Sequence, residues 1–262
     1  MIAKFELDKL AEKYEKEYFI ESDPVQFPHK FKNKKDVEIA GFIASLVAYG
    51  SRKVFIKKLE NLFEIAQFEP LNFILNFEEG ILGDFNYRFG RTEDFNEIFK
   101  VMRALYSNDG GLEELFKYAW KNTGTLRDTK FFSIVTDYFY SRVSGNAGQG
   151  FYFMIPNPDN GGAMKRMNMF LRWMVRKPPV DFGLWAFIPV SELLIPLDVH
   201  VARVSREMGL LKRNSNDFKA VVELTDCLKQ FDHDDPVKYD FATFGYGVSQ
   251  EKIMAQGRGN NS

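Results

Sequence analysis

The sequence predicts an all-α protein. Apolar residues recur at intervals of three and four along most of the 262-residue chain, the spacing that buries one face of an α-helix. Alternation of apolar and polar residues over four or more positions, the pattern of a half-buried strand, is nearly absent. Glycine and other turn-forming residues gather at 77–90 and 144–150, where we expect a loop and a flexible connector between helices.

Three helix signals follow one another in the first part of the chain. Apolar residues from Phe5 to Tyr18 form a stripe at helical spacing. The segment 36–49 is apolar almost throughout, which predicts a buried helix. Basic and apolar residues share the segment 52–66 with helical periodicity, and Ser51 is its expected N-cap.

Helix signals continue toward the C-terminal region. Thr92 is the expected cap of the next helix, because two acidic residues follow it in the first turn, where the helix dipole favours them. The segments 111–120 and 128–143 repeat the amphipathic pattern. Near the end, Asp235 stands in a cap position before Pro236, and proline suits the first position of a helix.

Composition limits the classes of function. With 45% hydrophobic residues, the chain is long enough for one large domain or two lobes. Its 35 basic and 36 acidic residues give a net charge of -1. The overall charge therefore predicts no polyanionic partner, and a nucleic-acid site would have to be a local basic patch.

Cysteine and histidine usage argues against a metal centre. A single cysteine, Cys227, excludes a disulfide framework, a cysteine-rich zinc site and a four-cysteine iron–sulfur cluster. His29, His200 and His233 are too scattered to indicate a metal site. The charged N-terminal segment is no signal peptide, and no run of about 18 apolar residues is present. We therefore expect a cytoplasmic protein with no metal, cofactor or membrane span.

Lys165 follows a turn and opens a predicted helix. The segment IPNPDNGGAMKRM passes from turn-forming residues directly into the helical pattern. The N-terminal end of a helix dipole disfavours an ammonium ion, and the neutral amine is a nucleophile toward a sugar carbon or a carbonyl group. The amides of Gly161 and Gly162 are candidates for holding a phosphate oxygen. The alternative is a solvated Lys165 beside Arg166 on a polar helix face.

Asp198 lies among apolar residues at the start of another predicted helix. In IPLDVHVARV it is the expected N-cap, a position from which a carboxylate accepts hydrogen bonds from the first amides of the helix. A carboxylate fixed there can also stabilise a cationic, oxocarbenium-like sugar or accept the proton of a nucleophile. The two roles are compatible, so the residues alone leave both open.

Together, the two segments resemble a known superfamily. A glycine-containing turn leading into Lys165, followed by PLDVHVARV, resembles the helix–hairpin–helix DNA glycosylases. In the lyase-competent members of that superfamily, a hairpin lysine is the nucleophile and a later aspartate is essential. The resemblance therefore implies these roles for Lys165 and Asp198. Their separation (198 − 165 = 33) is similar to that of the archaeal 8-oxoguanine glycosylases.

The same comparison shows where this chain differs from the superfamily. The segment IPNPDNGGAMK lacks the compact Gly-x-Gly hairpin, and the iron–sulfur cysteines found in some members are missing. Tyr49 and Gly50 stand where many members place a glutamine that fills the gap left by a flipped base. As a whole, the chain resembles a bacterial family with no assigned function, through the motifs KRMNMFLRWMVR, VDFGLW and DPVKYDFA.

Further residues complete the predicted site. Trp185 and Phe182 are candidates for stacking on an extruded base, although aromatic residues in helical proteins are more often core. Tyr49 and His200 are further substrate-side candidates, and local packing is the alternative for His200. The candidates for phosphate contacts are Arg52, Lys53, Arg166, Arg203 and Arg206. The alternative is that these charged side chains only keep a helix face in contact with water.

The sequence-based hypothesis is a two-lobed, helical, DNA glycosylase-like protein that removes a damaged base from duplex DNA. We expect a barrel lobe over 36–176 to carry Lys165, and a second lobe from 1–35 and 177–250 to carry Asp198. The base would enter a cleft between them, and 251–262 would be a flexible tail. We expect a monomer. The alternatives are a non-catalytic nucleic-acid-binding relative and a helical protein of unrelated function.

Overall fold

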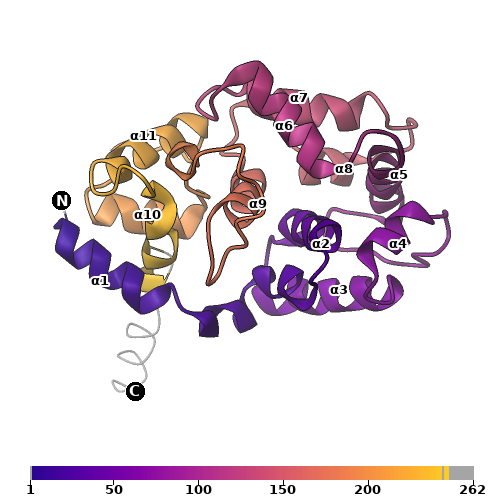
Figure 1. Cartoon of the computed structure of the whole chain (residues 1–262), viewed down its shortest axis with the longest axis horizontal. Coiled ribbons are helices and arrows are strands. Elements are labelled where there is room, and N and C mark those ends of the chain that lie inside the picture. The colour runs from indigo at the N-terminus through magenta and orange to yellow at the C-terminus, as the bar shows by residue number, and fades with distance from the viewer. Residues whose placement is uncertain (1, 244, 248–262) are drawn as a thin grey trace, which may run out of the picture. The chain divides into compact units, whose positions relative to one another are not determined.

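A computed structural model describes residues 2–243 and 245–247 of the chain (Figure 1). Every regular element in this range is a helix, and extended pairing is limited to isolated bridges between Tyr87 and Gly90 and between Gly162 and Asp217. The all-α fold predicted from the sequence is confirmed. The expected tail at 251–262 lies outside the described residues.

By its internal contacts, the chain divides into two compact units. Unit 1 comprises the described residues of 1–19, 161–182 and 189–262, and unit 2 comprises 20–160 and 183–188. These boundaries differ from the predicted lobes. The segment around Lys165 joins unit 1 because its turn and its helix are bonded to residues near the C-terminal end, whereas 20–35 joins unit 2 because its short helical turns pack on the central helix of that unit.

Unit 2 is built around helix α2 (Lys34–Val47). Every residue of this helix from Val37 to Val47 is buried, as the apolar sequence predicts. The helix contacts α3 (Arg52–Ile65), α4 (Pro70–Leu75) and α6 (Leu112–Thr123). A largely apolar helix that is buried on all sides from Val37 to Val47 thus forms the centre of the unit.

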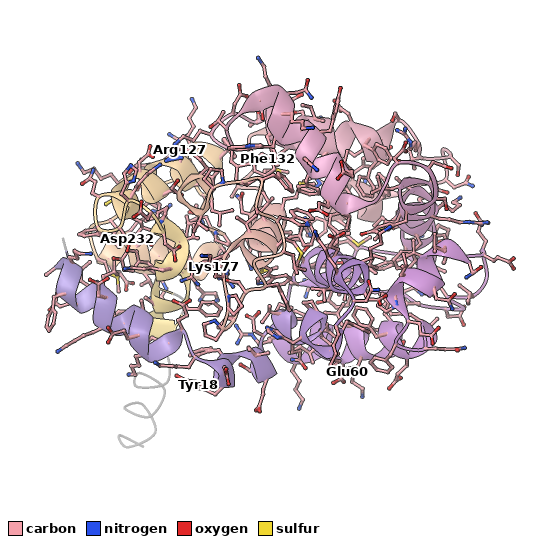
Figure 2. The ribbon with its side chains drawn as sticks, in the orientation of Figure 1. Tyr18, Glu60, Arg127, Phe132, Lys177 and Asp232 are labelled. Atoms are coloured by element: carbon pink, nitrogen blue, oxygen red, sulfur yellow. The ribbon has the colours of Figure 1, made fainter. Side chains whose placement is uncertain are left out.

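The other helical elements of unit 2 contain both buried residues and residues that are partly or fully exposed. They are α5 (Thr92–Asn108), α7 (Lys130–Tyr140), α8 (Gln149–Met154), η2 (Pro24–Gln26), η3 (Pro28–Lys30) and η4 (Pro158–Asn160). Phe132 on α7 is fully buried and Glu60 on α3 is exposed; Figure 2 labels both side chains. A 3-10 segment, η1 (Glu17–Ser22), begins in unit 1 and ends in unit 2.

Unit 1 combines the N-terminal helix with elements from the last third of the chain. Its elements are α1 (Lys4–Tyr14), α9 (Lys165–Val175), η5 (Val190–Glu192), α10 (Val199–Glu207), α11 (Phe218–Lys229) and η6 (Pro236–Tyr239). Residues 240–243 continue as helix after η6. Both α1 and α11 contact η6, which brings the two ends of the chain into one unit.

The predicted helix starts are mostly correct, with one shift. Ser51 occupies the N-cap position of α3, without a side-chain hydrogen bond. The prediction for Thr92 is wrong, because Arg91 is the N-cap and Thr92 is the first residue of α5. The Thr92 hydroxyl instead donates to the carbonyl of Phe85 (3.0 Å), which fixes the preceding loop. Asp235 does precede η6, although its carboxylate binds Arg176 and not the helix amides.

Candidate functional site

Lys165 and Asp198 form an ion pair within unit 1. Lys165 Nζ lies 3.2 Å from Asp198 Oδ2, although the two residues are far apart in the chain. About a third of the lysine side chain and a fifth of the aspartate side chain are exposed (33% and 21%), so a ligand can reach the pair. Each residue begins a helix: Lys165 is the first residue of α9, and Asp198 is the N-cap of α10.

The carboxylate of Asp198 divides its two oxygens between two partners. Oδ1 accepts a hydrogen bond from the backbone amide of Val201 (2.8 Å), the bond expected of an N-cap. Oδ2 faces the ammonium group of Lys165. The cap thereby fixes the orientation of the oxygen that meets the lysine, so the capping role supports a second role for Asp198.

The chain before Asp198 is fixed by burial. All residues from Leu193 to Leu197 are buried, and the backbone amide of Ile195 donates to the hydroxyl of Thr225 on α11 (3.1 Å). Thr225 is itself fully buried. Burial of an extended apolar segment removes conformational freedom from Asp198 at its end, which places the carboxylate with little disorder.

The turn before Lys165 presents the start of α9. Met164 is the N-cap in a left-handed conformation (φ 49°), without a side-chain cap bond, and no acidic residue lies in the first turn of the helix. The carbonyl of Gly161 accepts from the amide of Phe218 (2.9 Å), and Gly162 pairs with Asp217 in a β-bridge. The amides at the start of α9, together with Lys165, suit an anion such as phosphate.

Asp217 connects this turn to the start of α11. Its carboxylate accepts from the amide of Ala220 (3.0 Å) as the N-cap of α11, and it pairs with the guanidinium of Arg213 (Nε to Oδ1, 2.7 Å). The hydrogen bonds from Arg213 lower the pKa of Asp217 to about 2. Sequence reasoning missed Asp217, although an aspartate directly before the apolar pattern of FKAVVELTDCLK is a visible cap signal.

Replacing Asp217 with asparagine should make the protein less stable near neutral pH, by up to about 1 kcal/mol, because asparagine keeps the cap but loses an exposed ion pair. The pKa of Asp217 is lower in the folded than in the unfolded protein, so its stabilising charge is fully present above about pH 4. That stabilisation is lost as the pH falls through the folded pKa of about 2.

Urea unfolding of both proteins at several pH values measures this difference. The gap in unfolding free energy between wild type and Asp217→Asn should be constant above about pH 4 and should close toward pH 2. A difference in unfolding free energy that does not change with pH would mean that the ion pair with Arg213 does not stabilise the folded protein. Arg203→Gln at another exposed pair of unit 1, in which Arg203 lies 3.0 Å from Glu207, serves as the control.

Helix α9 is anchored at its other end by a buried ion network. Asp181 is fully buried, and its two carboxylate oxygens meet Arg172 Nε (3.3 Å) and Arg176 Nη1 (3.2 Å). Arg172 also binds Asp240, and Arg176 also binds Glu15 and Asp235. Burial opposes the charged form of Arg176, but the surrounding carboxylates outweigh it and raise the pKa of that side chain. The network connects the end of α1, the segment after α9 and both ends of η6 to the helix that carries Lys165.

The other predicted residues of unit 1 lie in different environments. His200 is exposed on the first turn of α10, next to Val199, whose side chain is 70% exposed. Arg203 pairs with Glu207 (3.0 Å). Arg206 donates to the carbonyls of Arg213 (2.8 Å) and Asn214 (2.9 Å), so it stabilises the loop after α10, a role that the phosphate prediction did not include.

Two further predicted residues of unit 1 are half-buried. The amide of Phe182 donates to the carbonyl of Trp173 (2.8 Å), and Arg166 lies on α9.

The remaining predicted residues belong to unit 2. Trp185 is fully buried, and its Nε1 donates to Glu38 (3.0 Å), whose pKa is raised by burial. Stacking on a base would require this ring to be uncovered. Tyr49 is half-buried at the end of α2, and its hydroxyl donates to the carbonyl of Tyr87 (2.9 Å). Arg52 and Lys53 occupy the first turn of α3, with Lys53 exposed.

The described part of the chain offers no candidate metal site and no candidate membrane span. Among the described residues, no three His, Cys, Asp or Glu side chains are grouped so that they could hold a metal ion. No helix in the described part of the chain has the length and apolar character needed to cross a membrane.

Comparison with known proteins places the chain in a family. A family model described as a protein of unknown function, DUF2400, matches residues 23–249. Neither a curated protein nor a solved structure matches the chain. The match includes Lys165, Asp198 and the anchoring residues Asp181 and Asp217, so the site lies within the family domain. Because the matched region covers most of its length, the chain belongs to the DUF2400 family.

Proposed function

We propose that the protein removes a damaged base from duplex DNA, with Lys165 as the nucleophile and Asp198 as its catalytic partner. One observation carries the proposal: Lys165 Nζ lies 3.2 Å from Asp198 Oδ2, within the distance over which a general base takes a proton. The resemblance to the helix–hairpin–helix DNA glycosylases implies the same two residues, and it supplies the class of substrate.

The geometry suits attack by an amine on a sugar carbon. In the proposed reaction, Nζ of Lys165 forms a bond to C1′ of the damaged nucleotide, while the bond from C1′ to the base breaks and its electron pair leaves with the base. Asp198 first accepts a proton from the ammonium group of Lys165, which frees the amine for attack, and then returns that proton through water to the departing base. The nitrogen bonded to C1′ gives a proton to O4′ as the C1′–O4′ bond of the sugar opens, which leaves a protonated Schiff base between Nζ and C1′. The carboxylate of Asp198 also stabilises the positive charge that develops on the sugar.

The start of α9 suits the DNA backbone. Its first amides have no side-chain cap and no acidic neighbour in the first turn, so they can donate to a phosphate next to the damaged nucleotide. Arg166, the second residue of the helix, adds a positive charge at the same end. A phosphate held there would bring C1′ of the neighbouring sugar toward the amine.

An oxidised purine is the expected substrate, most specifically 8-oxoguanine, because the separation of Lys165 and Asp198 is similar to that of the archaeal 8-oxoguanine glycosylases.

In the test, the full chain is incubated with duplexes that carry 8-oxoguanine or other lesions, and borohydride is added. We expect base release and a reduced protein–DNA crosslink on the oxidised purine, and neither on undamaged duplex. Duplex binding without release across the panel would favour a non-catalytic relative. No binding even at low salt, where phosphate contacts are strongest, would favour an unrelated function.

Asp198→Asn should separate the capping role of Asp198 from its chemical role. Asparagine caps a helix as well as aspartate does, and the lost ion pair is partly exposed, so the unfolding free energy should fall by no more than about 1 kcal/mol. Base release should slow about a hundredfold or more, because the amide accepts no proton from Lys165. Single-turnover excision and thermal melting measure the two quantities. Unchanged excision would leave Asp198 as a cap only.

A further inference from the structure

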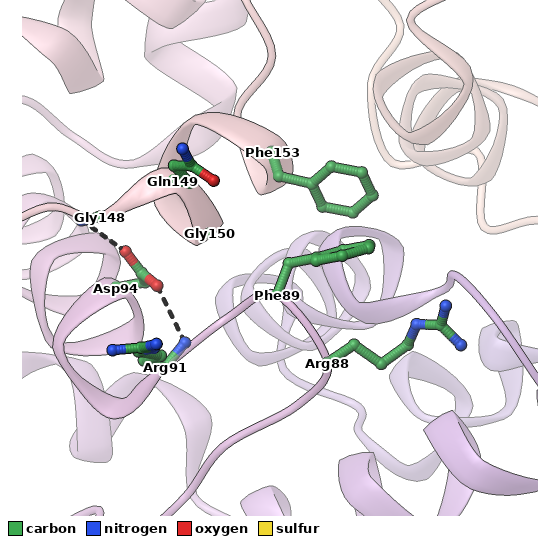
Figure 3. A pocket seen from close by; sticks show the side chains of 8 residues that line it. All are labelled: Arg88, Phe89, Arg91, Asp94, Gly148, Gln149, Gly150 and Phe153. Carbon is green, nitrogen blue, oxygen red and sulfur yellow. Dashed lines mark hydrogen bonds between the residues drawn. The ribbon is translucent and has the colours of Figure 1, made fainter.

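Unit 2 contains a cavity of about 590 Å³ that is separate from the lysine–aspartate pair. It lies between the turn that precedes α5 and the start of α8, and we name it the turn pocket (Figure 3). Its walls include Arg88, Phe89 and Arg91 from the turn and Phe153 from α8. The volume is in the range of a small-molecule or single-nucleotide site.

Hydrogen bonds and close packing hold the floor of the turn pocket in place. The carboxylate of Asp94, which is 2% exposed, accepts from the amides of Arg91 (2.9 Å) and Gly148 (2.7 Å), as Figure 3 shows. Gly150 packs so closely that an added Cβ would lie 2.3 Å from the carbonyl oxygen of Phe89. These contacts tie the turn to α8, so the cavity is a fixed feature of the unit.

Two aromatic rings line this cavity and remain open to solvent. Phe89 is 56% exposed and Phe153 is 38% exposed, with ring centroids 4.9 Å apart. The ring of Tyr49 packs against Phe153 in an edge-on contact, with ring centroids 4.8 Å apart. Adjacent exposed rings that neighbouring residues hold in place offer flat apolar surfaces on which another planar group can stack.

Positive charge accompanies the rings. Arg88 and Arg91 are both exposed, and neither forms an ion pair with a described residue. The guanidinium of Arg88 lies 5.7 Å from the ring centre of Phe89. Asp94 supplies the only carboxylate among the described lining residues, so the two cations outweigh it. A ligand with an aromatic ring and a negative group fits this arrangement.

The backbone of Arg88 supports a role for its side chain. Arg88 lies in the left-handed region (φ 50°), in a tight turn closed by two hydrogen bonds between Tyr87 and Gly90 (2.8 Å each). Glycine or asparagine adopts this conformation at lower cost than arginine does. Non-glycine residues held in this region are concentrated at functional sites.

We propose that the turn pocket binds one unpaired nucleotide, with its base stacked on Phe89 or Phe153 and its phosphate held by Arg88. Aromatic stacking and arginine–phosphate contacts are the usual means of binding single strands without sequence preference. A free nucleotide offers the same chemistry as a nucleotide in a strand. The site does not depend on the chemistry of Lys165 and Asp198, because it lies in unit 2 and breaks no bond.

The first test measures stacking. Fluorescence anisotropy of a labelled oligothymidylate of about ten nucleotides, titrated with the full chain at low salt, gives the affinity. We expect Phe89→Ala to weaken binding about tenfold, and Phe68→Ala, at an aromatic residue that is 43% exposed elsewhere in unit 2, to leave it unchanged. Competition by thymidine monophosphate shows whether a free nucleotide suffices. Equal displacement by polyphosphate, which has no rings, would overturn the proposal, as would binding that is indifferent to Phe89→Ala.

The second test separates the side chain of Arg88 from its backbone. Arg88→Gly relieves the left-handed conformation, so the melting temperature should be unchanged or higher, while the slope of log affinity against log salt should become shallower by about 0.7. Gln67→Gly is the matched control, because Gln67 is also exposed and left-handed (φ 52°) but lies outside the pocket. An unchanged slope in Arg88→Gly would contradict the phosphate contact. The oligothymidylate carries no damaged base, so its binding is measured independently of the proposed activity.

Discussion

Lys165→Gln is expected to abolish the borohydride-dependent crosslink to DNA that carries an oxidised purine. An imine forms only from a primary amine, and the amide of glutamine cannot take part in that reaction. Lys165 is one-third exposed at the start of α9, and its ion partner Asp198 is also held by the cap bond to Val201. The substitution should therefore lower the unfolding free energy by less than about 1 kcal/mol. Gel mobility after reduction, together with thermal melting, checks both expectations.

Arg166→Gln is the matched control for this experiment. Arg166 is the next residue of α9 and carries the same charge, but it is not the partner of Asp198 in the ion pair. That variant should bind duplex less tightly and with a weaker salt dependence, yet still form the crosslink at saturating DNA. A crosslink that survives in Lys165→Gln would place the nucleophile on another amine and refute the assignment.

The helical fold could be predicted from the sequence because its signal is local. Burial of α2 follows from the apolar run at 36–49, and α9 and α10 begin where turn and cap residues predict. The assignment of segments to units could not be predicted in the same way. It depends on bonds between distant residues, such as the amide of Phe218 to the carbonyl of Gly161, and periodicity carries no information about them.

For the candidate site, the sequence predicted the residues but not how they are held. Asp198 was recognisable as a carboxylate at a helix start, and the structure adds that one oxygen caps while the other meets Lys165. Asp181 has a similar signal, an acidic residue among apolar neighbours in PPVDFGLW, yet its two arginine partners lie on another element. Trp185 shows the opposite case: the sequence made it a candidate for stacking on a base, but its ring is fully buried. The identity of an aromatic residue does not reveal whether its ring is buried or exposed.

The second large effect is expected at Asp181, which anchors the end of α9 opposite Lys165. Both of its oxygens accept from guanidinium groups, Arg172 on one side and Arg176 on the other, and none of its side chain is exposed. Charges in such a place are stable only while each is compensated, because water cannot solvate them. Removal of one charge therefore costs more than the loss of an exposed ion pair does.

Asp181→Asn should lower the unfolding free energy by about 3–5 kcal/mol, a large part of the 5–15 kcal/mol typical of a folded domain. Asparagine has nearly the same shape as aspartate, but its amide NH₂ would face an arginine donor and its charge is gone, so Arg172 and Arg176 would lose their shared counter-charge. Urea unfolding at neutral pH measures the loss. Glu207→Gln, which removes an exposed partner of Arg203 in the same unit, should cost no more than about 0.5 kcal/mol. If Asp181→Asn cost less than about 1 kcal/mol, Asp181 would already be neutral in the folded protein, because a neutral acid and an amide differ little in that position.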